Sequence, residues 1–260
     1  MQGFWRLPGV SLRFIPVWQR NLLVWKKLAW SSVLANVAEP LISLVAFGYG
    51  LGAILLSIQG ESYVRFLASG YICTSIMNSA TFETLYSTFS RMHVQRTWDS
   101  LLNAPLDLDD IVTAEWVWAA TKSVMSGCAI LLVLMVLDIS RAPTLLLTLP
   151  LFVLVGLTFA GMGLVINAIA RGYDFFSYYI TLLMTPMMFL SGVFFPLSQL
   201  PGWLQTVAQY LPLKAAIDLI RPLVLGHFPD AVIGPVGILL AYGLGGFYLA
   251  VALTRRRLLQ

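Results

Sequence analysis

Four ionisable side chains lie in apolar surroundings, where a charge is expensive to bury. They are Glu39, Glu83, Glu115 and Lys122, each inside or at the edge of a long run of hydrophobic residues. Charged groups in hydrocarbon either pair with one another or line a pathway for protons, ions or solutes. We expect Lys122 to pair with Glu83 or with Glu115. Whether these charges are structural or functional is open from the sequence.

Residue patterns for other chemistry do not occur in the sequence. There is no G-x-x-x-x-G-K-[ST] loop to cradle nucleotide phosphates, and no Ser-His-Asp or Cys-His pairing suggests itself. Cys73 and Cys128 both lie in apolar runs, where a packing role is favoured over a disulfide or a metal site. We therefore expect no catalytic residues, no metal and no cofactor on this chain.

A dense group of aromatic residues is the third feature that could handle a ligand. Aromatic side chains favour the membrane–water interface, so a simple belt is one interpretation. The alternative is a path or gate whose flat apolar faces suit acyl chains and sugar rings. The candidate path residues are Phe175, Phe176, Tyr179, Phe189, Phe194, Phe195, Pro196 and Trp203.

Composition indicates which elements must position these side chains. Of the 260 residues, 58% are hydrophobic and 11% are charged, with a mean hydropathy of +0.81. A soluble domain needs about 25% charged residues to cover its surface. The chain is therefore expected to be an all-α integral membrane protein, a single domain over residues 1–260. Six stretches are long and apolar enough to span a bilayer, at about 34–58, 63–88, 111–137, 144–169, 175–197 and 231–253.

Two further segments have a different character. Residues 11–30 place Trp and basic residues at helical spacing, which favours a helix lying in the interface plane against membrane lipids. A mere flank that anchors the first span is the alternative. Region 198–230 is apolar but broken by Pro201, Pro212, Pro222, Gly226 and Pro229, which favours short re-entrant helices packed against protein.

Basic residues predict the orientation. With both termini in the cytoplasm, 11 of the 16 Lys and Arg residues lie on the inner side and four on the outer side. The charges are spread between apolar runs rather than gathered in a patch, so nucleic acid is not an expected partner.

The connector between the second and third stretches is the most informative polar segment. Residues from Met92 to Leu102 can form a short amphipathic helix that Asn103-Ala104-Pro105 ends. A rigid helix joining two spans is suited to transmit force from a docked protein. A plain polar connector is the alternative.

Several of these parts together resemble the ABC-2 type permease family. They are the basic interface helix, Glu39-Pro40 at the first span, the connector from Arg91 to Pro105, and the segment LSGVFFPL at 190–197 followed by Leu200-Pro201 and YLPL at 210–213. Nearly the whole chain is similar, and its nodulation-factor export branch (the NodJ branch) is the most similar part of the family.

This resemblance implies a half-transporter in the bacterial inner membrane. Two copies would pair as a homodimer and bind two copies of a separate ABC ATPase, which would hold ATP and Mg²⁺. Region 198–230 would gate the exit, and the cargo would be a lipo-oligosaccharide, another glycolipid or polysaccharide, or a drug. The connector would be the coupling helix seated in the ATPase, through Arg91, Met92, Val94, Arg96, Trp98, Asp99 and Leu102.

Three other functions compete with that expectation. An ion-coupled secondary exporter predicts repeats and buried titratable ligands, and the sequence shows neither a repeat nor a carboxylate set. A membrane-embedded enzyme or a scaffold without transport activity are the remaining alternatives.

Overall fold

The computed structural model is a bundle of long helices, described here for residues 5–27, 29–50, 52, 57–58 and 60–258. In α2, the side chains of residues 31–33, 35–37, 39–40 and 49 lie outside this description, and the Glu39 side chain is one of them. The α-helices are α1 Phe14–Lys26, α2 Ala29–Gly50, α3 Tyr63–Phe82, α4 Thr97–Leu102, α5 Leu108–Val136, α6 Thr148–Ile169, α7 Asp174–Tyr179, α8 Thr185–Leu190, α9 Gly202–Ala208, α10 Pro212–Leu225 and α11 Ile233–Leu258.

Shorter elements link these helices. The π-helical turns η1 Glu83–Thr88 and η2 Ser90–Val94 continue α3, and η4 Ile180–Met184 joins α7 to α8. The 3-10 turns are η3 Pro143–Leu147 and η5 Leu197–Gln199. Strands β1 Ser57–Ile58 and β2 Glu61–Ser62 form a small antiparallel hairpin in which Ser57 pairs with Ser62 and Ile58 with Glu61.

Three helical segments of the described chain are long and apolar enough to cross a membrane. They are Leu108–Val136, Pro143–Ile169 and Ile233–Leu258, which agree with the third, fourth and sixth predicted stretches. The other three stretches are also largely helical, but in shorter or less apolar pieces. The number of six spans therefore stays a prediction.

Two predicted stretches end earlier than expected. The first was predicted to run to residue 58, but α2 ends at Gly50 and Ser57–Ile58 form a strand; residues 51 and 53–56 lie outside the described chain. The fifth was predicted to run to residue 197, but helix α8 ends at Leu190. A turn follows because Gly192 has φ +79°, a conformation that glycine adopts without strain.

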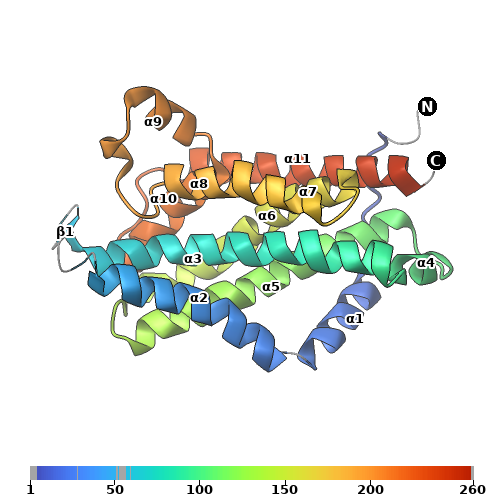
Figure 1. Cartoon of the computed structure of the whole chain (residues 1–260), viewed down its shortest axis with the longest axis horizontal. Coiled ribbons are helices and arrows are strands. Elements are labelled where there is room, and N and C mark those ends of the chain that lie inside the picture. Colours follow the sequence, from blue (N-terminus) through green and yellow to red (C-terminus); the bar gives the residue numbers. More distant parts are fainter. Residues whose placement is uncertain (1–4, 28, 51, 53–56, 59, 259–260) are drawn as a thin grey trace.

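The arrangement in space groups the polar connectors at one end of the bundle. Figure 1 shows α4 and both chain ends at one end, whereas α9 and the β1–β2 hairpin lie at the other. Helix α1 covers only part of the predicted interface segment 11–30, because residues 29–30 already belong to α2. Region 198–230 folds as α9 and α10, and α10 buries Leu213, Ala216 and Ile220 in the core.

Helices α6 and α11 approach closely because glycines face one another. A Cβ at Gly161 would lie 2.8 Å from the Gly243 carbonyl oxygen, and one at Gly246 would lie 2.9 Å from the Gly161 carbonyl carbon. Small residues at such crossings let helix backbones pack tightly in lipid. Helices α3, α5 and α6 together form the main core, which includes Ile76 of α3, Phe152 of α6 and other large apolar side chains.

Candidate functional site

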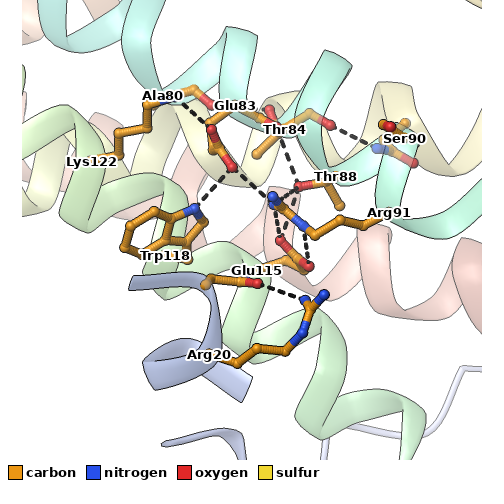
Figure 2. Close-up of polar contacts among 12 residues, drawn as sticks. Arg20, Ala80, Glu83, Thr84, Thr88, Ser90, Arg91, Glu115, Trp118 and Lys122 are labelled. Atoms are coloured by element: carbon orange, nitrogen blue, oxygen red, sulfur yellow. Dashed lines mark hydrogen bonds and ion pairs between the residues drawn. The ribbon is translucent and has the colours of Figure 1, made fainter. Parts of the chain in front are cut away.

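A cluster of four ionised side chains joins the connector end of α3 to α5. The Arg91 guanidinium donates from Nε to Glu115 Oε1 at 2.9 Å and from Nη2 to Glu83 Oε1 at 2.9 Å. Nη2 also donates to Glu115 Oε2. Lys122 Nζ lies 2.7 Å from Glu83 Oε2, so two cations neutralise two carboxylates (Figure 2).

Neutral donors complete the cluster. Trp118 Nε1 donates to Glu83 Oε1 at 2.9 Å, and Thr88 Oγ1 donates to Glu115 Oε2 at 3.1 Å. Glu83 and Glu115 are only 3% and 1% exposed. Because a buried carboxylate without partners is very costly, this full set of donors is what lets both acids remain charged.

Local helix geometry brings these residues together. Glu115, Trp118 and Lys122 follow the i, i+3, i+7 spacing that places side chains on one face of α5. Glu83 begins the π-helical turns of the α3 extension, and Arg91 lies in the second of them. Turns of this kind occur mostly as short insertions in α-helices and are frequent at functional sites.

The predicted pairing of Lys122 with Glu83 is present, and Glu115 pairs instead with Arg91. Sequence reasoning assigned Arg91 to the coupling surface and missed its role as the central cation of the cluster. The signal was available, since Arg91 is the first basic residue after the second apolar stretch and Glu115 lies in the first turns of the third. An arginine at such an edge can reach back to a buried acid.

The connector is not one continuous helix, which corrects the expectation of a helix from Met92 to Leu102. Arg96 has φ +49° in the left-handed region, so η2 ends before it and α4 begins after it. Trp98 and Met92 are 2% and 5% exposed and pack with Ile111 and other core residues. The exposed side of the predicted coupling set therefore consists of Val94, Arg96, Asp99 and Leu102.

A second ion pair ties the C-terminal helix to the start of α5. Arg255 Nε donates to Asp109 Oδ1 at 2.8 Å, and Arg255 Nη1 donates to the Arg6 carbonyl oxygen at 2.5 Å. The Gly9 amide donates to Asp109 Oδ2 at 2.8 Å. The sequence indicated only that the final arginines mark the inner side, so this link between both chain ends and α5 was missed.

The predicted aromatic path residues do not share one environment. Phe176 and Tyr179 are buried; the Phe176 ring packs on the rings of Tyr86 and Phe89 with centroids 5.4 and 5.2 Å apart. The Phe194 ring stacks on that of Phe189 at 5.2 Å. The remaining candidates divide into exposed Phe175 and Trp203, half-buried Phe195 and buried Pro196. Their role as a path stays a prediction.

An open cavity of about 600 Å³ lies beside the ion cluster, between α1, the α3 extension and α5. Its lining includes Arg20, Asn21 and Trp25 of α1, with Trp118 and Lys122 of α5. Helix α1 is anchored there, because Trp18 Nε1 donates to Thr121 Oγ1 at 3.1 Å and the Trp25 and Trp118 rings meet edge to face at 6.3 Å.

Comparison with known proteins identifies the class. The model of the ABC-2 type transporter family matches residues 13–225, and the chain belongs to this family. It is thus a membrane subunit of a bacterial transporter.

The individual relatives extend the match over the whole chain. It is 49% identical to nodulation protein J of Rhizobium leguminosarum bv. trifolii over 254 residues, covering 98% of this chain and 97% of that protein. It is 45% identical to nodulation protein J of Rhizobium meliloti, covering 97% of each chain. The inner membrane transport permease YadH of Escherichia coli is 24% identical over 92% of this chain and 93% of that protein.

Proposed function

We propose that this chain is the permease subunit of an ATP-driven exporter for a lipid-linked or amphiphilic oligosaccharide. The observation that carries the proposal is the full-length similarity to nodulation protein J within the ABC-2 family. Two copies pair in the inner membrane with six spans each and cytoplasmic termini, and two separate ATPase subunits supply ATP and Mg²⁺. The cargo leaves from the cytoplasm or the inner leaflet.

The connector is suited to couple ATPase movement to the spans. Its exposed residues Val94, Arg96 and Asp99 offer a contact surface, whereas Trp98 is buried against the α5 and α11 core. Arg91, three residues before Val94, is held by the carboxylates of Glu83 and Glu115. Movement of an ATPase bound to this surface would therefore displace both α3 and α5, because the ion pairs of Arg91 connect the connector rigidly to these two helices.

The ion cluster also bears on the competing ion-coupled exporter. A proton-coupled site needs a carboxylate that gains and loses its proton during transport. Glu83 and Glu115 are both engaged by cations, and the cluster of four side chains is neutral overall. This arrangement favours a structural role for the two acids and supports the ATP-driven mechanism.

Co-purification tests the proposal directly. The tagged full chain is extracted gently from its native membranes and analysed by mass spectrometry and ATPase assay. We expect a stoichiometric ATPase subunit and vanadate-sensitive turnover. A lone oligomer without ATPase activity would refute the ATP-driven mechanism and turn attention to the ion-coupled alternative.

The coupling surface is tested with charge changes at exposed positions. Arg96→Glu and Val94→Asp should leave the chain folded but lower transport at unchanged or higher ATP hydrolysis. Arg141→Glu is the matched control, because this exposed arginine lies between α5 and α6, at the end of α5 away from the connector. Normal export by both connector variants would show that the ATPase binds elsewhere.

A further inference from the structure

The cavity beside the ion cluster has polar groups that the protein itself leaves unused. It is open, has a volume of about 600 Å³, and lies where α1 packs against the α3 extension and α5. Its walls combine an apolar part, Val24 and Trp25, with Arg20, Asn21 and Lys122. The balance of donors and acceptors among these residues indicates what kind of molecule fits.

The Glu83 carboxylate, which is the anionic acceptor at the cavity wall, is already occupied. Glu83 accepts from Arg91 and Trp118 on one oxygen and from Lys122 on the other. Behind it, Glu115 accepts from Arg91 on both oxygens. These carboxylates have little capacity left for a ligand that donates hydrogen bonds.

Donors, in contrast, remain available. Asn21 is only 3% exposed and lines the cavity, and its Nδ2 has no hydrogen-bond partner among the residues that the structure describes. A buried amide donor without a partner costs roughly 1–3 kcal/mol, so a bound acceptor would remove a real penalty. Lys122 uses one of its three N–H donors on Glu83, and its side chain is 20% exposed.

Arg20 adds a positive charge to this donor-rich wall. Its Nη1 donates to Asn21 Oδ1 at 3.2 Å, which leaves most of the five-donor guanidinium available to a ligand. Figure 2 shows Arg20 reaching from α1 toward the side of α5 that carries the cluster. Because the four clustered charges cancel, Arg20 makes the cavity positive by one charge.

We propose that this cavity binds the anionic headgroup, a phosphate or sulfate ester, of an inner-leaflet amphiphile. Arg20, Asn21 Nδ2 and Lys122 bind the oxyanion, and the apolar side chains of α1 face the attached chain. The inner-leaflet placement rests on the proposed orientation of the permease. Occupancy would hold α1 against α5, so a bound lipid would stabilise the connector end of the protein.

Native mass spectrometry of the full chain in a neutral detergent tests this site. The probes are phosphatidylglycerol and, as the phosphate-free comparison, diacylglycerol with identical acyl chains, titrated separately. We expect about tenfold tighter binding of the first phosphatidylglycerol, the size of effect that one hydrogen-bonded charge contact gives. Arg20→Gln and Asn21→Leu should each remove most of this preference. Lys26→Gln, which removes an exposed cation from the same helix, should retain it.

The controls separate the possible outcomes. If all variants prefer phosphatidylglycerol as strongly as the unmodified chain does, the proposed site is wrong. It is also wrong if the unmodified chain shows no preference for phosphatidylglycerol. Displacement of the lipid by inorganic phosphate at a concentration equal to that of the lipid would overturn the assignment to a lipid and identify a free oxyanion as the ligand. Should Asn21→Leu fail to fold, the more exposed Arg20→Gln still decides the result. Since no ATPase takes part, failure of the proposed exporter function would leave this outcome unchanged.

Discussion

Replacing Arg91 by methionine should be among the most damaging single changes in this protein. The substitution keeps the volume of the side chain but removes the charge that both carboxylates share. Glu83 retains Lys122 and Trp118, whereas Glu115 is left with the hydroxyl of Thr88. Removing one partner of a buried ion pair costs about 3–5 kcal/mol, because the other charge stays buried without compensation.

The expected effect is measurable as thermal stability. For a chain of this size, about 1 kcal/mol corresponds to roughly 2–4 °C, so Arg91→Met should lower the unfolding midpoint by on the order of 10 °C. Size-exclusion chromatography of the heated, detergent-solubilised chain gives this midpoint. Arg141→Met is the matched control: its ion pair with Asp138 is largely exposed, and such pairs contribute little.

A second substitution tests whether the unpaired Glu115 charge causes the loss of stability. Glu115→Gln in the Arg91→Met background removes the orphaned charge, while Lys122 still neutralises Glu83. We expect the double variant to regain at least half of the lost thermal stability. If Arg91→Met is no worse than Arg141→Met, or if adding Glu115→Gln lowers the midpoint further, the buried-charge argument is wrong.

Three further predictions concern other contacts. Gly161→Ala should lower the unfolding midpoint by several degrees because the added Cβ meets the α11 backbone, whereas Gly245→Ala, with open space around it, should not. Arg255→Gln should expose the N-terminal segment to limited proteolysis, because it weakens the link to α5 and to that segment; Arg256→Gln, on an exposed side chain, is the control. Burial lowers the pKa of His93 below its ordinary value of 6.5, so the folded protein favours the neutral ring. The unfolded chain therefore binds the proton more readily, and stability should fall as pH drops through about 6.5. A His93→Gln variant should show a flatter dependence of the unfolding midpoint on pH, and an unchanged slope would contradict this assignment.

Hydropathy and motif content determined the class of this protein. The excess of apolar residues requires a membrane environment for any fold, and the stretches that form α5, α6 and α11 follow from length and composition alone. The LSGVFFPL segment and its neighbours carried the family resemblance because they are local in sequence. Pairing between Lys122 and Glu83 was also predictable from the sequence, since charged residues inside membrane spans usually pair with residues of opposite charge.

Only the tertiary structure decided which side chains face which. Trp98 looks like a contact residue in an amphipathic connector, but the left-handed Arg96 turns α4 so that this indole lies in the core. Arg91 looks like a connector charge, but π-helical turns carry it back to Glu115, which is 24 positions along the chain. Hydrophobic periodicity predicts which residues are buried, but it does not predict how one helix is rotated about its axis relative to its neighbour. That rotation is fixed by packing between segments far apart in sequence, and it created both the ion cluster and the cavity beside it.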